Sequence, residues 1–332
     1  MAVSSRIRIV GALTITAALV AAGCSKKDTG SESGPDTTAV SVETTTSATD
    51  VTTPETTPEA KPVPGGTLLV SGESEVANAW TPAAMQCDAY CHQRARTFFE
   101  PLTAYGSDMT THNVLAESVE PNADFTQWTV KARPNITFHD GTPFNADAII
   151  SNLQKAGTSL LISNALKDVA KNPDGSLMLN KVDDMTVTIF TGRNGDVNTP
   201  VPWPGFPRAL GTQWGLMASP TWLDAVAAGT GDPTMAVGTG PFIVESYAPR
   251  DKLVVVKNPT YWQKDADGNQ LPYLDKIEFR VIEDPSTALQ ALRSGDIDIF
   301  TTGYSDVIGQ VRDNPDGLES TERNQFVSST YL

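Results

Sequence analysis

Residues 272–300 read PYLDKIEFRVIEDPSTALQALRSGDIDIF, and this stretch decides the fold class. It favours strands at 277–281 and at 296–300, where acidic and apolar residues alternate strictly. Between them, residues 285–293 space their apolar side chains as a helix does, and Gly295 suits the C-terminal cap. A strand, a helix and a second strand in succession predict an α/β or mixed α+β fold.

The chain after residue 65 carries the same mixture of signals. We expect a helix over 87–99, which Pro101 stops, and a second helix capped by Asn145. The proline-rich section 194–215 is expected to be an irregular loop. Further strands are expected at 66–71, 128–130, 136–138, 186–190, 242–247 and 253–257.

The composition excludes several classes of protein. The chain has 332 residues and a formal net charge of −15, so it lacks the basic face that a nucleic-acid backbone binder needs. Hydrophobic residues make up 39% and charged residues 19%, which is enough for a buried core. Its three cysteines are too few for a disulfide scaffold and lack the spacing of a structural zinc site. We therefore expect a globular protein that binds no nucleic acid.

The N-terminus is typical of an export signal. Two arginines precede an apolar run over 9–20, which is too short to span a bilayer. The run ends in AAGC at 21–24, which resembles the lipobox of bacterial lipoproteins apart from the alanine at position 21. This predicts a lipoprotein signal peptide over 1–24, with lipidated Cys24 as the only membrane contact, on the outer face of the cell membrane. The alternative is an ordinary secretory signal with an incidental Cys24.

Residues 25–64 are expected to form a disordered tether. The first 38 of these residues, 25–62, contain 11 Thr and 5 Ser with hardly any large apolar side chain. Such a segment cannot bury enough surface to offset its ordering entropy. The folded part is therefore expected to begin near Gly65.

Cys87 and Cys91 would lie on one face of the helix predicted over 87–99. One helical turn would separate their Cα atoms by roughly 6 Å, which a disulfide can bridge in an oxidising compartment. Two buried free thiols are the alternative, because so short a closed loop gains little chain-entropy stabilisation.

Motifs of enzymes and metal sites are missing from the sequence. It contains no nucleophile elbow, no zinc-protease motif and no complete phosphate-binding loop. The run GTG at 238–240 leads into Pro241 and is interpreted as a tight turn before a strand. His139 is interpreted as a hydrogen-bonded structural residue rather than a metal ligand. We predict that the chain is not an enzyme and uses no metal or cofactor.

Four stretches together resemble one known family. They are LAES at 115–118 leading to WTVK at 128–131, FHDGTPFNA at 138–146, GTGPF at 238–242 with KNPTYW at 257–262, and PYLDKI at 272–277 with LRSGDID at 292–298. In this order and spacing they resemble the extracellular solute-binding proteins of family 5, the peptide and nickel type of ABC importers.

The resemblance implies a two-lobed periplasmic-binding-protein type II-like fold. The first lobe would comprise 65–85 and 185–295, with 86–184 as an inserted subdomain, and the chain would cross into the second lobe near Asp296. A small solute, most simply a peptide, would be enclosed between the lobes and delivered to an ABC permease in the membrane. The protein would be a monomer if complete.

The resemblance also nominates ligand-facing residues. The positions implied to face the ligand are Gln86, Asp88, Thr301, Thr302 and Tyr304. Trp203, in the proline-rich section, would either stack on the solute or fill the core.

Relatives in this family continue well beyond residue 332. The second lobe, 296–332, is therefore expected to be incomplete, with 328–332 as an unfinished strand, and this form of the chain is expected to bind solute weakly. The alternative function is an anchored interaction protein without a transport role, or a non-functional fragment, that uses the same scaffold.

Overall fold

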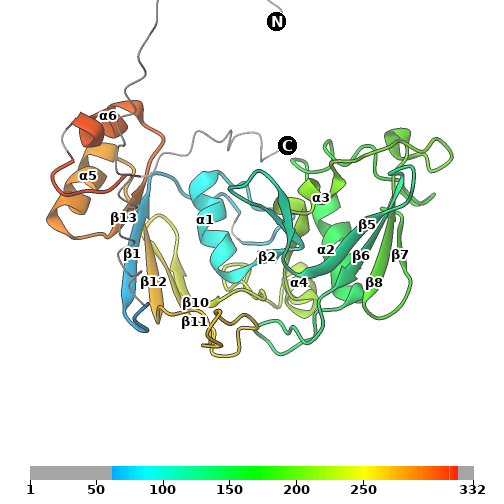
Figure 1. Ribbon diagram of the computed structural model, residues 1–332, viewed down its shortest axis with the longest axis horizontal. Coiled ribbons are helices and arrows are strands. Elements are labelled where there is room, and N and C mark those ends of the chain that lie inside the picture. The colour runs from blue at the N-terminus through cyan, green and yellow to red at the C-terminus, as the bar shows by residue number, and fades with distance from the viewer. Residues whose placement is uncertain (1–61, 79, 314, 321–332) are drawn as a thin grey trace, which may run out of the picture. The chain divides into compact units, whose positions relative to one another are not determined.

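The computed structural model describes residues 62–78, 80–313 and 315–320 (Figure 1). The predicted signal peptide with Cys24, the tether up to residue 61 and the strand expected at 328–332 lie outside these residues. The described residues belong to one compact unit, which contains a five-stranded and a four-stranded sheet. Within these ranges no helix is long and apolar enough to cross a membrane.

The five-stranded sheet has the strand order β10-β11-β12-β1-β13. Strand β1 is parallel to its neighbours β12 and β13, whereas β11 is antiparallel to both β10 and β12. Its strands are β1 (Thr67–Gly72), β10 (Phe242–Ala248), β11 (Lys252–Lys257), β12 (Lys276–Val281) and β13 (Ile299–Thr301). The strands expected at 66–71, 242–247, 253–257 and 277–281 are thus confirmed.

The connection between β12 and β13 is the predicted helix, α5 (Pro285–Ser294). Asp284 caps its start, and Gly295 ends it in the left-handed conformation with a φ of 80°. Strand β13 begins later than predicted, because the carboxylate and the N–H of Asp298 pair with the N–H and the carbonyl of Leu69 on β1. Helix α6 (Ser305–Asp313) follows.

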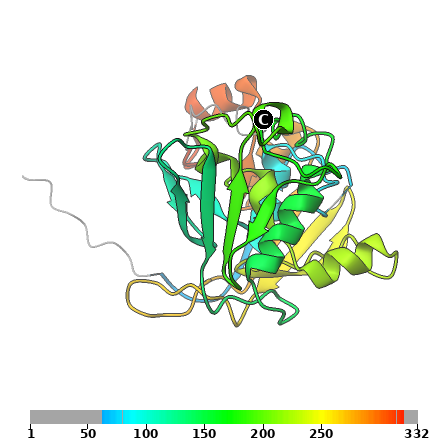
Figure 2. The ribbon, with the colours of Figure 1, turned by 90° about the vertical axis from the view of Figure 1, so that its right-hand side faces the viewer.

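The four-stranded sheet is antiparallel and has the strand order β5-β6-β8-β7. Its strands are β5 (Ala116–Pro121), β6 (Gln127–Ala132), β7 (Leu179–Lys181) and β8 (Thr186–Phe190). Helix α2 (Ala146–Gly157) packs against this sheet (Figure 2). The Asn145 side chain caps the helix, as predicted, by accepting a hydrogen bond from the Ala148 N–H.

The strand expected at 136–138 is wrong. Ile136 and Phe138 are buried, but Thr137 forms only an isolated bridge to Pro143. The chain folds back on itself here, with the Phe144 N–H bonded to the Ile136 carbonyl. Strand β6 instead pairs with β5 and β8, so no place beside it remains for this segment.

Shorter elements connect the two sheets. The section expected to be an irregular loop, 194–215, is mostly irregular but includes a turn of α-helix, α3, and short 3₁₀ turns at its two ends. These elements are β2 (Glu100–Pro101), β3 (Thr103–Tyr105), β4 (Thr111–Asn113), η1 (Arg193–Gly195), α3 (Phe206–Ala209), η2 (Gln213–Gly215), β9 (Leu216–Met217) and α4 (Pro220–Ala227).

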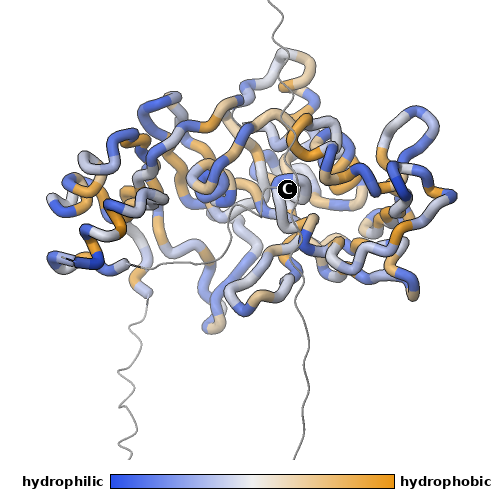
Figure 3. The backbone as a smooth tube through the Cα atoms, turned by 90° about the horizontal axis from the view of Figure 1, so that it is seen from above, coloured by the Kyte–Doolittle hydropathy of each residue, from blue (hydrophilic) through white to orange (hydrophobic). Residues whose placement is uncertain are grey.

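Each sheet has its own buried core, and hydrophilic stretches lie mainly in the outer loops (Figure 3). Helix α1 (Ala89–Phe98) belongs to the core of the five-stranded sheet. Strand β8 lies beyond 184 but completes the hydrogen bonding of β6 and β7. The observed division therefore differs at both ends from the subdomain expected over 86–184. Strand β13 still pairs with β1, so residues 299–301 belong to the five-stranded sheet, and the crossover expected near Asp296 stays a prediction.

Glu100 in β2 is a buried carboxylate that joins separate segments. Its oxygens accept hydrogen bonds from the Tyr261 hydroxyl at 2.7 Å, the Thr239 hydroxyl at 2.9 Å and Trp262 Nε1 at 3.0 Å. Burial raises the pKa of Glu100 above its ordinary value of 4.5, although these hydrogen bonds act in the opposite direction. The motifs GTGPF and KNPTYW thus meet at one buried group.

The turn at 238–240 lies so close to α1 that a glycine is required. A Cβ atom on Gly238 would lie 1.8 Å from the Phe98 carbonyl oxygen. Beside this turn, His139 Nδ1 accepts a hydrogen bond from the Gly238 N–H at 3.3 Å, and Nε2 donates to the Gly240 carbonyl at 3.0 Å. Burial lowers the pKa of His139, which favours the neutral ring, and its two hydrogen bonds to the turn agree with the structural role that the sequence indicated.

Candidate functional site

Three parallel strands end at the same edge of the five-stranded sheet. Strands β12, β1 and β13 all have their carboxyl ends there, as their register shows. In open α/β sheets, ligands bind outside the carboxyl ends of such strands. We use the name carboxyl edge for the residues here that end or follow β1 and β13, together with their neighbour on α1. These residues are Glu73, Thr301, Thr302, Tyr304 and Gln93.

The carboxyl edge gathers three of the residues nominated from the sequence. Thr302 donates a hydrogen bond from its hydroxyl to the Glu73 carboxylate, and its oxygen accepts one from the Tyr304 N–H at 3.1 Å. Thr301 donates to the Gln93 side-chain oxygen at 3.0 Å. The Tyr304 side chain is 49% exposed. Thr301, Thr302 and Tyr304 therefore share one surface, and polar side chains from two other elements complete it.

Sequence reasoning missed Glu73 and Gln93. Glu73 is the first polar residue after the strand predicted at 66–71 that can carry a charge, and this position at a strand end was the available signal. Gln93 lies within α1, and nothing in its local sequence distinguishes it from a solvated helical residue.

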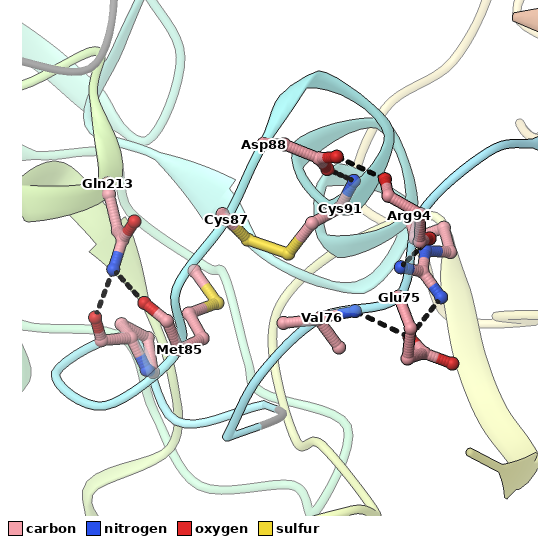
Figure 4. The surroundings of a disulfide bond; sticks show 10 residues. Glu75, Val76, Met85, Cys87, Asp88, Cys91, Arg94 and Gln213 are labelled. Atoms are coloured by element: carbon pink, nitrogen blue, oxygen red, sulfur yellow. Dashed lines mark hydrogen bonds and ion pairs between the residues drawn. A yellow bond between two sulfur atoms is a disulfide. The ribbon is translucent and has the colours of Figure 1, made fainter. Parts of the chain in front are cut away.

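Gln86 and Asp88 lie at the start of α1, beside the same edge. Asp88 caps the helix by accepting a hydrogen bond from the Cys91 N–H at 2.8 Å, and it also accepts one from the Ser74 hydroxyl (Figure 4). Gln86 is exposed, and its N–H bonds to the Ala77 carbonyl at 2.9 Å. Asp88 thus holds the loop after β1 against α1.

A buried ion pair holds the loop that follows β1 against α1. Arg94 is 1% exposed and donates to the Glu75 carboxylate at 2.7 Å. Its guanidinium lies 4.6 Å from the Tyr90 ring centroid. Partial burial raises the pKa of Glu75, but the hydrogen bond from the Arg250 N–H and the charge of Arg94 outweigh it, so the pKa is lowered. The loop therefore carries a charged anchor that holds its conformation.

Cys87 and Cys91 are joined by a disulfide bond, with their Cα atoms 5.0 Å apart (Figure 4). Cys87 precedes the cap residue Asp88, so it lies just outside the helix in which the sequence placed it. The bond ties the segment before α1 to the first turn of the helix.

Cys87 also lines a pocket of about 390 Å³. Trp203 forms another wall, and its ring packs edge-on against the buried Phe206 ring with centroids 5.4 Å apart. Trp203 therefore contacts the core with one part of its ring and the pocket with another. The lining residues, which define the Trp203 pocket, are Cys87, Leu161, Ile162, Ala165, Leu166, Trp203, Ala209, Thr212, Gln213 and Trp214.

Among the residues that the structure describes, no group of three or more His, Cys, Asp or Glu side chains is placed to hold a metal ion. The arrangement at the carboxyl edge instead offers a carboxylate, an amide and hydroxyls at an exposed surface. These groups suit the recognition of a polar small molecule through hydrogen bonds and charge.

Comparison with known proteins places this fold in a family. A profile described as bacterial extracellular solute-binding proteins, family 5 Middle, matches residues 110–331. The chain is 31% identical over 219 residues to the glutathione-binding protein GsiB of Pectobacterium atrosepticum, a match that covers 63% of this chain and 37% of that protein.

Solved structures of the same kind share the fold. The periplasmic binding protein DppA of Helicobacter pylori, in complex with the peptide STSA, aligns with a TM-score of 0.61 at 21% identity and covers 76% of this chain and 50% of its own. A nickel ABC transporter structure from Bacillus halodurans aligns with a TM-score of 0.58 at 28% identity and covers 75% of this chain and 45% of its own. The chain thus spans half or less of the length of these relatives.

These findings confirm the mixed α/β fold of periplasmic binding proteins that the sequence predicted. They also agree with the prediction that the chain is not an enzyme, because the family consists of solute-binding proteins. The profile match covers more than half of the chain. The chain belongs to the bacterial extracellular solute-binding proteins of family 5.

Proposed function

We propose that this chain is the solute-binding component of an ABC importer, and that it captures a peptide or a related small solute and delivers it to a membrane permease. The names of its relatives support a small peptide, because glutathione is itself a tripeptide and DppA holds the peptide STSA. The proposed site is the carboxyl edge.

One observation carries the proposal: the carboxyl edge combines an acidic group with neutral hydrogen-bonding groups. The Glu73 carboxylate is placed to pair with a positive amino group of a solute. The Thr301 hydroxyl and the Gln93 amide are suited to peptide N–H and carbonyl groups. The Glu75–Arg94 ion pair beneath them holds the loop, so less ordering entropy is lost when solute binds.

A photoreactive tripeptide tests this site. Irradiated with the purified chain, it should label residues 73–75 and 301–304, as located by mass spectrometry of fragments, and excess unlabelled tripeptide should compete. Glu73→Gln should reduce the labelling by about fivefold or more, because a charged hydrogen bond is lost. Glu120→Gln, at an exposed position on β5, is the control and should label normally. Labelling elsewhere, or equal labelling of all variants, would refute the site.

The transport role requires an experiment in cells. Deletion of the gene from its source bacterium should reduce uptake of radiolabelled tripeptides, and a gene copy that encodes the natural protein should restore it. A copy with Glu73→Gln should restore uptake less well. Unchanged uptake in the deletion strain across a panel of tripeptides would favour the interaction-protein alternative.

We also propose that the protein is held outside the cytoplasm by a lipid on Cys24. The apolar run followed by AAGC supports this, and family 5 proteins are extracellular. In cells grown with labelled fatty acid, the natural protein should become labelled but Cys24→Ser should not, because the variant lacks the proposed attachment site. One modified cysteine carries enough acyl chains for stable anchoring. Release of both forms into the medium would indicate a secretory signal instead.

A further inference from the structure

We propose that the Trp203 pocket is a subsite for an aromatic or bulky apolar group of the solute. This inference rests on the proposed function and adds the chemistry of the solute: a molecule with a polar end, bound at the carboxyl edge, and an apolar ring.

Part of the lining of the Trp203 pocket consists of apolar side chains that are held in the core. Trp214 is 1% exposed, and its Nε1 donates to the Leu153 carbonyl at 3.2 Å, which holds the ring in place. Ile162 and Leu166 are 8% and 3% exposed and pack in the same core. These side chains are part of the core whether or not solute is present, so the pocket is preformed.

The polar side chains in the lining are turned to other partners. Gln213 Nε2 donates to the carbonyls of Pro82 at 2.8 Å and Met85 at 2.9 Å, and Figure 4 shows its amide nitrogen directed at that loop. The Thr212 hydroxyl donates to the Ala209 carbonyl at 2.7 Å. Because these donors are engaged, the pocket favours an apolar ligand over a polar one.

The rim of the pocket exposes large apolar side chains. Leu161 lines the pocket and is 55% exposed, and its neighbour Leu160 is 89% exposed. An apolar ring in the pocket would remove part of the Leu161 surface from water, which is favourable. The volume of about 390 Å³ accepts a group of indole size, since a cavity of about 150 Å³ already holds benzene.

The pocket borders the carboxyl edge through two consecutive residues. Cys87 lines the pocket, and Asp88 bonds to Ser74 in the loop after β1. Their Cα atoms are about 3.8 Å apart, as in any trans peptide. The Cys87–Cys91 disulfide fixes this shared wall to α1. In this proposal, the polar end of the solute lies on the Asp88 side of this wall and its apolar group on the Cys87 side.

The experiment has two arms. In the first, saturation-transfer NMR measures the affinity of free indole, which tests the pocket alone. Ala165→Phe places a ring in the pocket from an exposed position, so the variant should fold normally. Ala266→Phe, at an exposed position outside the pocket, is the matched control. In the second arm, calorimetry compares the tripeptides Ala-Ala-Ala and Ala-Ala-Trp.

We expect indole to bind the natural protein and Ala266→Phe alike, and to bind Ala165→Phe at least about tenfold more weakly. Ala-Ala-Trp should bind the natural protein at least about tenfold more tightly than Ala-Ala-Ala, and Ala165→Phe should remove this difference. Unchanged indole binding by Ala165→Phe, or equal affinities of the two tripeptides for the natural protein, would overturn the subsite. Indole binding without any tripeptide binding would instead refute the proposed function and leave the pocket as an apolar ring site.

Discussion

Replacement of Glu100 should destabilise the protein by an amount that its hydrogen bonds determine. In Glu100→Ala, three donors lose their acceptor, two on the buried Tyr261 and Thr239 and one on the half-buried Trp262. Each unsatisfied donor costs about 1–3 kcal/mol, and water that enters the vacated space recovers part of this. We expect a loss of about 3–5 kcal/mol, a large part of the about 5–15 kcal/mol that usually stabilises a domain.

Glu100→Gln separates the charge from the hydrogen bonds. Its amide oxygen can accept from Thr239 and Trp262, and its NH₂ group can donate to the Tyr261 hydroxyl, which is able to accept. All three contacts keep a partner atom, but the Tyr261 O–H loses its acceptor, so the expected loss at pH 7 is about 1–3 kcal/mol, less than for Glu100→Ala.

The pH dependence has a definite sign. Because burial raises the pKa of Glu100 in the folded state, the folded protein binds a proton more tightly than the unfolded chain does. The stabilisation from this proton is fully present below the unfolded pKa of 4.5 and is lost as the pH rises through the folded pKa. The free energy of unfolding of Glu100→Gln should not show this decrease as the pH rises.

Urea denaturation followed by tryptophan fluorescence, at pH values from 5 to 8, measures these quantities. Glu120→Ala, at an exposed position on β5, serves as the control and should change the free energy of unfolding by less than about 0.5 kcal/mol. If Glu100→Ala costs no more than the control, or if Glu100→Gln keeps the pH dependence of the natural protein, the reasoning about this cluster is wrong.

Three further predictions concern local features. Gly238→Ala places a Cβ atom 1.8 Å from the last carbonyl oxygen of α1, so circular dichroism should show a strongly lowered melting temperature, whereas Gly303→Ala, in open space, should melt normally. Burial lowers the pKa of His139 in the folded state. Its contribution to the free energy of unfolding should therefore be present above the unfolded pKa of 6.5 and be lost as the pH falls below it. Denaturant melts of His139→Asn should not show this loss. Thiol counting on the denatured, unreduced protein should find Cys87 and Cys91 blocked, and two free thiols from this pair would contradict the bond. Reduction of the bond should lower the free energy of unfolding by only about 2 kcal/mol by the chain-entropy relation, since the closed loop is short.

The strand–helix–strand unit from β12 to β13 was predictable because its signals are local. Asp284 and Gly295 cap α5 through contacts within a few residues, and the apolar spacing between them specifies the buried face. The strand expected at 136–138 failed for the opposite reason. Its apolar alternation is real, but β5 and β8 already occupy both sides of β6, and the segment had no partner left.

The candidate site likewise contains some residues that the sequence could indicate and others that it could not. Thr302 and Tyr304, which the resemblance nominated, lie together at one edge of the sheet, and their contact with a solute stays a prediction. The resemblance did not indicate Glu73, whose bond to Thr302 joins residues 229 apart in the chain. The Trp203 pocket likewise needed the fold, since its walls come from three separated segments at 87, 161–166 and 203–214.

By itself, the sequence determined the class of fold, the helix caps and the family, because these depend on periodicity, on turn residues and on motifs that lie close together in the chain. Only the tertiary structure decided that Glu73 and Gln93 join the carboxyl edge, that Glu100 connects two motifs, and that Cys87 lies between that edge and an apolar pocket. The physical reason is that such contacts depend on how the two sheets and α1 pack together, and packing brings together side chains whose separation in the sequence carries no signal of their proximity.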